Sequence, residues 1–148
     1  MAELGPRATR LMTAGFDASM GFEIVTATAD EVVLEYTVDD RHRQPYGIVH
    51  GGVHCAAVET VCSMGAGLNG LARGQAVVGV ENHTSFIHAV RNGRVRVTGR
   101  PLTRGRRSQL WEATARDESG RLVASGKVRL LCLDAGSDLA GEPVGVKA

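Results

Sequence analysis

The sequence lacks the features that mark a membrane, secreted or nucleic-acid-binding protein. It has no run of 18 apolar residues, so no segment is expected to span a membrane. The first residues, MAELGPRATRL, lack the apolar stretch of a signal peptide, and we therefore expect a cytoplasmic protein. The net charge of +1 argues against nucleic-acid binding through bulk charge.

Cysteine is also scarce. The three cysteines, Cys55, Cys62 and Cys132, have no CxxC spacing, which favours buried free thiols over a disulfide or a metal site. The other totals are those of an ordinary globular domain, because 43% of the 148 residues are hydrophobic and 22% are charged. The 19 glycines predict many turns and at least one close approach of the backbone to another group.

The hydrophobic pattern predicts one long helix and six strands. Residues 52–68 are apolar and too long for one strand, and their Ala, Met and Glu residues favour a helix that is buried on nearly every side. A shorter helix is predicted over residues 6–16. Runs rich in β-branched residues and bounded by turn signals predict strands over residues 21–30, 31–38, 76–90, 94–103, 108–117 and 122–133.

This order of elements defines the fold class. Short connections between the last four strands require antiparallel neighbours, and a helix that is apolar on all sides needs a sheet curled around it. We therefore predict an α+β fold in a single domain over residues 1–148. Its core spans about residues 20–133, and residues 134–148 are expected to form a loose tail.

One charged residue stands out in the predicted long helix. Glu59 is the only Asp, Glu, Lys or Arg between Gln44 and Ala72. A carboxylate that loses hydration has a raised pKa and becomes a better base at neutral pH. Ser63 follows four residues later, on the same helix face. Glu59 is therefore our candidate base, although a carboxylate directed to solvent or paired with an arginine is the alternative.

The start of the same helix offers hydrogen-bond donors. His50, Gly51 and Gly52 precede its first apolar turn, and glycines let a ligand approach the backbone closely. The first N–H groups of a helix have no internal partner and lie at the positive end of its dipole, so they can stabilise an oxyanion. The alternative is that the two glycines only form a tight turn.

The spacing of these groups predicts a site shared between two chains. Glu59 lies seven residues after Gly52, which is roughly 10 Å along a helix axis. One substrate carbonyl can hardly contact both groups of the same helix. If both act together, the carboxylate must come from a second copy of the chain, and we therefore expect a homodimer with its sites at the interface.

The segment QPYGIVHGGVHCAAVETVCSMG resembles the central helix motif of hotdog-fold acyl-CoA thioesterases. The resemblance is to the PaaI-like branch, which includes 4-hydroxybenzoyl-CoA thioesterases. Downstream, VVGVENHTSF and then RNGRVRVTGRPLTRGRRSQLWEATARDESGRLVASGKVRL are also similar to that family. The resemblance covers residues 20–133 and implies a hotdog fold, an antiparallel β-sheet wrapped around one long central helix. It also implies dimers that often assemble to homotetramers.

The resemblance assigns roles to residues. Glu59 would be the general base or nucleophile, and the Gly52 amide, with Gly51 as a second donor, would polarise the thioester carbonyl. Gln44 and His50 would contact the same region, and Ser63 would orient the attacking water or the acyl group. These catalytic and binding candidates are Gln44, His50, Gly51, Gly52, Glu59 and Ser63.

Two further features concern substrate binding. In some relatives a strand histidine contacts the substrate, and the matching position here is Phe86. We therefore expect a pocket that is more apolar or differently shaped, and do not transfer that role. Arg106 and Arg107 follow a predicted turn, and arginine suits the phosphates of coenzyme A. A solvated basic turn is the alternative. His42 and His88 are expected to be surface groups.

We therefore expect an acyl-CoA thioesterase that needs no metal or redox cofactor, with an aromatic acyl group favoured by analogy alone. Attack by a water that Glu59 activates and a transient Glu59 anhydride both stay open. Two other functions also stay open. A hotdog enoyl-CoA hydratase or dehydratase would pair the motif histidine with an upstream Asp or Asn, where this chain has Gln44. A non-catalytic acyl-CoA-binding module would not need Glu59.

Overall fold

The computed structural model describes residues 15–145, so most of the helix predicted over residues 6–16 lies outside the described residues. Two short elements, helix α2 (Phe16–Ser19) and the 3-10 helix η1 (Asp40–His42), precede the long helix α3 (Gly51–Leu71). The strands are β1 (Glu23–Ala27), β2 (Val32–Thr37), β3 (Ala76–Phe86), β4 (Arg94–Arg104), β5 (Ser108–Arg116), β6 (Leu122–Leu133), β7 (Asp138–Leu139) and β8 (Glu142–Pro143).

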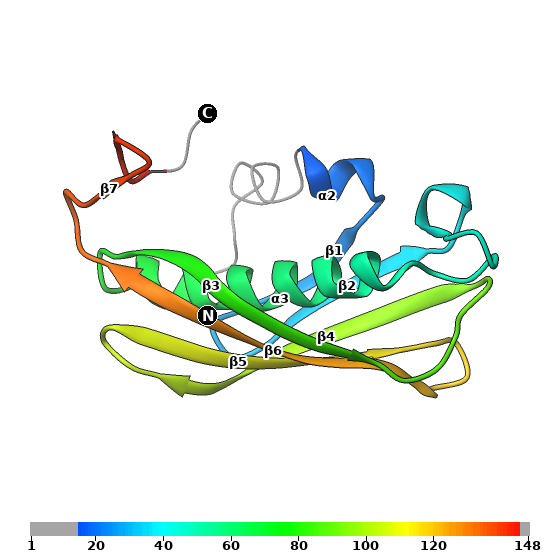
Figure 1. Ribbon diagram of the computed structural model, residues 1–148. Coiled ribbons are helices and arrows are strands. Elements are labelled where there is room, and N and C mark those ends of the chain that lie inside the picture. Colours follow the sequence, from blue (N-terminus) through cyan, green and yellow to red (C-terminus); the bar gives the residue numbers. More distant parts are fainter. Residues whose placement is uncertain (1–14, 146–148) are drawn as a thin grey trace.

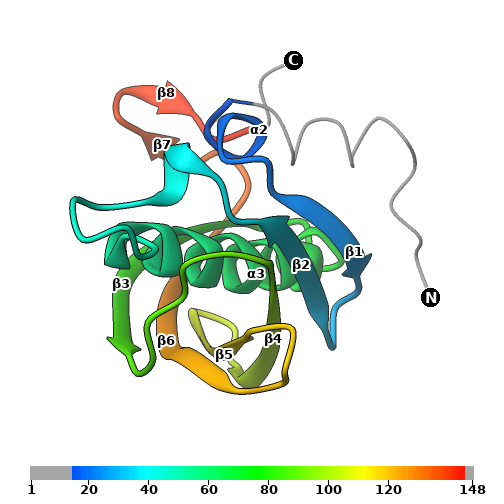
Figure 2. The ribbon, with the colours of Figure 1, turned by 90° about the vertical axis from the view of Figure 1, so that its right-hand side faces the viewer.

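Strands β1 to β6 form one antiparallel sheet in the order β1-β2-β4-β5-β6-β3. Helix α3 lies across one face of this sheet (Figure 1). The two edge strands, β1 and β3, lie on opposite sides of the helix because the sheet curls around it (Figure 2). The predicted α+β architecture, with one long helix packed against an antiparallel sheet, is confirmed.

Close packing against the sheet buries α3. A Cβ atom on Gly65 would lie 2.2 Å from Cη2 of Trp111, and one on Gly99 of β4 would lie 2.9 Å from a methyl carbon of Val61. These glycines let the helix approach the sheet more closely than an alanine would allow. Although α3 is about 30 Å long, no helix within residues 15–145 is long and apolar enough to cross a membrane.

The strands alternate between core and solvent, as their sequences predict. In β4, Val95 and Val97 are fully buried whereas Arg96 is exposed. Fully burying one such valine contributes about 1.5–3 kcal/mol. Alternation of this kind fixes the register, because a slip by one residue would expose the valines and bury the arginine.

Strand β3 differs from the others because it forms an edge of the sheet. Among the described residues it pairs only with β6, and most of its residues are exposed. The pairing register shifts between Gly79 and Glu81, so Val80 forms a β-bulge. The side of β3 that faces away from β6 therefore presents unpaired backbone groups.

Several boundaries differ from the prediction, as in β1, which spans Glu23–Ala27 instead of residues 21–30. Helix α3 spans Gly51–Leu71 instead of residues 52–68, because His50 caps it one residue earlier and the apolar run continues. Strand β3 ends at Phe86 instead of residue 90. The segment expected to be a loose tail contains the short antiparallel pair of β7 and β8.

The prediction that His42 lies on the surface is wrong. Its side chain is fully buried beside Tyr36, at a ring-centroid distance of 5.0 Å. The Nδ1 atom accepts a hydrogen bond from the Asp39 N–H at 2.9 Å, and Nε2 lies 2.7 Å from the Met20 carbonyl oxygen. These two contacts satisfy both ring nitrogens, which makes the imidazole a structural part of the core.

Candidate active site

The Glu59 carboxylate is half-buried and is held by two neutral donors. Ser63 Oγ–H donates to Oε1 at 2.9 Å, and the Asn82 amide donates to Oε2 at 2.9 Å. Each oxygen therefore has one donor from the protein and keeps lone pairs for a water or a substrate. No arginine or lysine pairs with Glu59 among residues 15–145. The predicted contact between Ser63 and Glu59 on one helix face is present.

Asn82 of β3 was not identified from the sequence. Its Nδ2 atom donates to Glu59 and also to the Cys55 carbonyl oxygen at 3.0 Å, while its Oδ1 accepts from Thr84 Oγ at 2.7 Å. The Thr84 hydroxyl thereby fixes which way the amide is turned. Asn82 joins the edge strand to the helix and positions the carboxylate between them.

Gly79 of β3 lies against the same carboxylate. A Cβ atom at this position would be 2.3 Å from Oε1 of Glu59, which is far inside van der Waals contact. Only glycine therefore lets the strand approach the acid this closely. Because Gly79 is exposed on the edge strand, Glu59 lies next to the unpaired edge of the sheet.

The start of α3 is capped by His50. Its Nδ1 atom accepts a hydrogen bond from the Gly52 N–H at 2.8 Å, so the neutral imidazole carries its proton on Nε2. The Gly52 amide, which we expected to polarise a carbonyl, is thus occupied. The Gly51 N–H has no acceptor among the described residues and is the open donor at this helix end.

Phe86, the last residue of β3, packs on this helix start. A Cβ atom on Gly51 would lie 2.4 Å from Cε2 of the Phe86 ring. The ring is 57% exposed and its centroid lies 6.1 Å from that of His54. Phe86 therefore forms an apolar wall beside the Gly51 N–H.

Gln44 belongs to the loop that leads into α3. Its Oε1 accepts from the Tyr46 N–H, and its backbone N–H donates to the Ile48 carbonyl oxygen at 2.9 Å. Gly47, with φ of 75°, completes this tight loop. Nε2 of Gln44 has no acceptor among residues 15–145, so the amide keeps a donor for a ligand.

The two halves of the expected site lie apart within one chain. Gly51 and Glu59 are eight residues apart on the same helix, about 12 Å along its axis. Arg106 and Arg107 are exposed at the turn between β4 and β5. Gln75 Nε2–H donates to the Arg106 carbonyl oxygen at 3.1 Å, which places this turn beyond the C-terminal end of α3.

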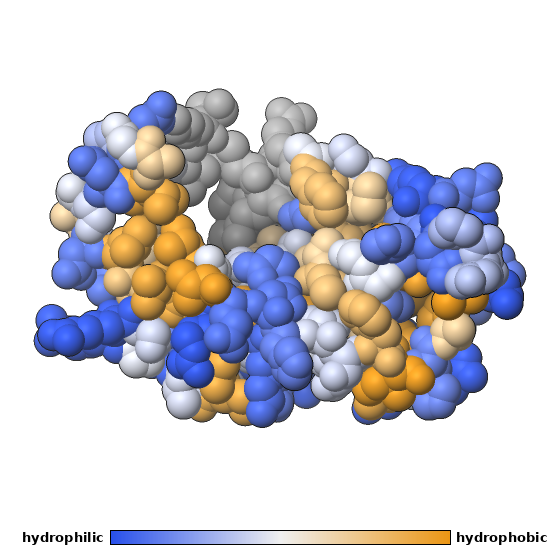
Figure 3. Space-filling model, viewed as in Figure 1, coloured by the Kyte–Doolittle hydropathy of each residue, from blue (hydrophilic) through white to orange (hydrophobic). Residues whose placement is uncertain are grey.

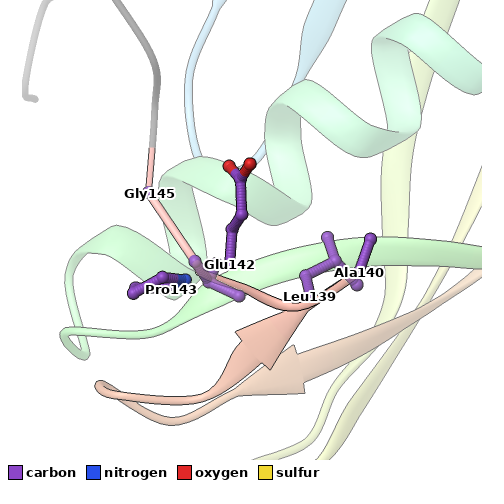
Figure 4. A pocket seen from close by; sticks show the side chains of 6 residues that line it. Leu139, Ala140, Glu142, Pro143 and Gly145 are labelled. Atoms are coloured by element: carbon purple, nitrogen blue, oxygen red, sulfur yellow. The ribbon is translucent and has the colours of Figure 1, made fainter.

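No other centre competes with this one in the described part of the chain. Residues 15–145 contain no group of three or more His, Cys, Asp or Glu side chains arranged to hold a metal ion. A pocket at the C-terminal hairpin lies near the end of α3 (Figure 4) and contains no histidine, cysteine or amide side chain. It is lined by Leu139, Ala140, Glu142, Pro143, Val144 and Gly145.

Comparisons with known proteins point to one family. A family model described as the thioesterase superfamily matches residues 46–124, a range that includes helix α3 with its Glu59. A candidate esterase of Mycobacterium tuberculosis is 41% identical over 126 residues, covering 84% of this chain and 90% of the relative. The proofreading thioesterase EntH of Cronobacter sakazakii is 42% identical over 107 residues, 71% of this chain and 77% of that protein.

Solved structures agree. The structure of the Mycobacterium tuberculosis protein has a TM-score of 0.80 at 41% identity, covering 81% of this chain and 97% of that chain. A thioesterase from Haemophilus influenzae has a TM-score of 0.81 at 28% identity, covering 90% and 93%. The chain therefore belongs to the thioesterase superfamily, has its hotdog fold, and is a thioester hydrolase.

Proposed function

We propose that this hydrolase cleaves acyl-CoA thioesters and that Glu59 supplies the reacting carboxylate. The observation that carries this proposal is the setting of Glu59. Two neutral donors hold the carboxylate, no cation of the described chain neutralises it, and it lies at the open edge of the sheet. A purely structural carboxylate in this position would be expected to pair with an arginine.

A second copy of the chain completes the proposed site. Strand β3 offers eleven residues of unpaired edge, and such an edge is normally covered. Figure 3 shows apolar surface on the side where β3 begins and hydrophilic surface at its middle. Pairing of two β3 strands about a two-fold axis would bring Glu59 of one chain toward Gly51 of the other. Two such dimers would make the tetramer that the resemblance implies.

Within this dimer the Gly51 N–H would polarise the thioester carbonyl. Gly51 takes the role expected of Gly52, because the Gly52 N–H is already donated to His50 Nδ1. The same bond directs the His50 proton to Nε2, so His50 can act as a second donor to the developing oxyanion. The free amide of Gln44 would contact the substrate near this point.

Two routes from this arrangement give the same products. In the first, Glu59 takes a proton from water while the water oxygen attacks the carbonyl carbon and the carbon–sulfur bond breaks. In the second, a Glu59 oxygen attacks the carbonyl carbon, CoA leaves as thiolate, and water then hydrolyses the mixed anhydride. In both, the leaving thiolate takes up a proton, and Ser63 and Asn82 hold the carboxylate in position.

The arginines at the β4–β5 turn would serve the other end of the substrate. Arg106 and Arg107 are exposed, and neither guanidinium makes an ion pair within residues 15–145. Coenzyme A is long and carries phosphates, for which a guanidinium fork is suited. We propose that these two arginines contact its phosphate groups.

The proposal is tested by measuring release of free CoA thiol from benzoyl, phenylacetyl, medium-chain and long-chain acyl-CoA esters. Turnover of at least one ester supports it, provided that the Glu59→Gln protein loses the activity. Absence of turnover with every ester would reject acyl-CoA as the substrate class. Hydration of crotonyl-CoA at a comparable rate would favour the hydratase alternative.

A further inference from the structure

The turn between β4 and β5 is fixed to the rest of the molecule through its backbone. Four consecutive carbonyl oxygens, those of residues 104–107, each accept a hydrogen bond from outside the turn. The Arg73 guanidinium donates to the first two, both at 3.1 Å. The Gln75 amide donates to the third at 3.1 Å, and the Cys132 backbone N–H donates to the fourth at 2.9 Å. Surface turns are commonly mobile, whereas these bonds hold this one in a fixed position.

Two guanidiniums without a partner lie on this fixed turn. The side chains of Arg106 and Arg107 are exposed and make neither an ion pair nor a hydrogen bond within residues 15–145. Arg73 adds a third positive charge beneath them, because its guanidinium bonds only to neutral carbonyl oxygens. Like charges gathered on one turn repel one another. Their arrangement therefore favours an anionic ligand at this place.

Gln75 holds the turn with an amide whose orientation is fixed. Its Nε2 atom also donates to Asp134 Oδ1 at 3.0 Å, so both amide hydrogens face acceptors. Its Oε1 atom is buried and has no partner in the described chain. A buried acceptor without a donor costs stability, and residues that break a local rule in this way are expected at functional sites. The hold on the turn therefore explains Gln75 better than a contribution to stability does.

The held turn lies far from the acid, as the phosphate end of the substrate would. Arg73 and Gln75 follow the last residue of α3, Leu71, which is 12 residues beyond Glu59, or about 18 Å along the helix axis. A ligand must be extended to contact both places. Coenzyme A has such a form, because a long pantetheine arm separates its thioester from its phosphates.

We propose that Arg73 and Gln75 are positioning residues for substrate binding, which hold the β4–β5 turn so that Arg106 and Arg107 meet the phosphates of coenzyme A. This inference rests on the proposed acyl-CoA hydrolysis and adds two residues that do not touch the reacting atoms. A turn that is already ordered loses less conformational entropy when the ligand binds. Loss of the bonds that hold it should therefore weaken substrate binding and leave the chemical step intact.

Two thioesters of the same acyl group test this proposal, one of coenzyme A and one of pantetheine, which has no phosphate. For Gln75→Met, a change that removes no charge, we expect KM for the CoA ester to rise about fivefold with kcat unchanged. Both constants for the pantetheine ester should keep their wild-type values, which also reports that the variant is folded. Arg73→Lys, which keeps the charge but loses the planar fork, should show a similar rise.

A matched control is available at the next hairpin. Arg116 donates to the Gly120 carbonyl oxygen at 3.0 Å in the turn between β5 and β6, at the other end of these strands. Arg116→Lys therefore makes the same change at a turn that carries no proposed ligand. It should leave kcat and KM unchanged for both esters.

A double-mutant cycle tests whether the positioning residues act through the two arginines. In the Arg106→Gln/Arg107→Gln background, Gln75→Met should raise KM no further, because no guanidinium is left to position. The proposal is overturned if the wild type has the same KM for both esters, if Gln75→Met changes neither KM or both equally, or if the two changes raise KM independently. In each of these cases acyl-CoA hydrolysis still stands. If no ester releases thiol, the proposed function fails as well.

Discussion

The Nδ2 atom of Asn82 lies 2.9 Å from Oε2 of Glu59, although 23 residues separate them in the chain. The same amide is turned by the Thr84 hydroxyl at 2.7 Å. Strand β3 therefore does more than extend the sheet, because it sets the direction in which the acid of α3 points. A proton acceptor or nucleophile must be held in this way to attack reproducibly.

Removing the carboxylate charge should abolish turnover without unfolding the protein. We expect Glu59→Gln to lower kcat by about a thousandfold. The melting temperature should change little, because the amide is isosteric and can still accept from Ser63. Steady-state thiol release and thermal unfolding measure the two effects. Glu112→Gln, on an exposed residue of β5, serves as the control and should keep the wild-type kcat.

Weakening the hold on Glu59 should have a graded effect. Asn82→Leu removes the donor to Oε2, and we expect kcat to fall about ten- to a hundredfold with KM nearly unchanged. Thr84→Val removes only the bond that orients Asn82, so its effect on kcat should be smaller. An equal loss in both variants, or a loss confined to KM, would contradict a positioning role for Asn82.

Two glycine substitutions should affect two different properties, kcat and the free energy of unfolding. Gly79→Ala places a methyl group 2.3 Å from the Glu59 carboxylate, so the acid must move, and we expect kcat to fall about a hundredfold. Gly67→Ala, in α3, meets nothing within 4 Å and should raise the free energy of unfolding by about 0.5–1 kcal/mol. Its activity should match the wild type. Chemical denaturation and thiol release together measure both effects.

Assembly and activity should be lost together. Val80 is 52% exposed at the bulge of β3, and Val80→Glu would place a charge on the proposed interface. We expect a monomer by light scattering, and kcat/KM lowered by at least about a hundredfold because the partner's amide is missing. Leu102→Glu, at an exposed position of β4, should leave both properties unchanged. A fully active monomeric Val80→Glu protein would overturn the shared site.

Burial of His54 should make stability depend on pH. The folded protein binds a proton there only near pH 4, whereas the unfolded chain binds one near the ordinary pKa of 6.5. The stabilising contribution is therefore present above pH 6.5 and is lost as the pH falls toward 4. The loss is on the order of 3 kcal/mol. Relative to His54→Gln, which does not titrate there, the unfolding free energy of the wild type should fall by this amount between pH 7 and 4.

The sequence was sufficient to predict the fold because its strongest signals are local. Alternation in strands such as β4 and the apolar run of α3 each show their structure within a dozen residues. The capping of α3 by His50 was harder to see, since histidine is not among the usual capping residues. Because His50 caps the helix, α3 begins at Gly51 instead of Gly52. The Gly52 N–H is bonded to His50, so Gly51 replaces Gly52 as the expected oxyanion donor.

The strand half of the site could not be predicted for a geometric reason. Gly79 and Asn82 are three residues apart, which in a regular strand would put them on opposite faces. The bulge at Val80 shifts the alternation, so both face Glu59. Nothing in the local sequence fixes the position of such a bulge. The burial of His42 was missed similarly, because its contact with Met20 spans 22 residues.

The bulge at Val80 also restricts which strands can pair with the exposed edge of β3. A straight foreign strand meets an interrupted ladder there and can align with only part of β3. In the dimer that we propose, the second copy carries the same interruption, and antiparallel pairing about a two-fold axis can bring the two bulges into register. The extra residue would thus favour pairing with a second copy over pairing with a foreign strand.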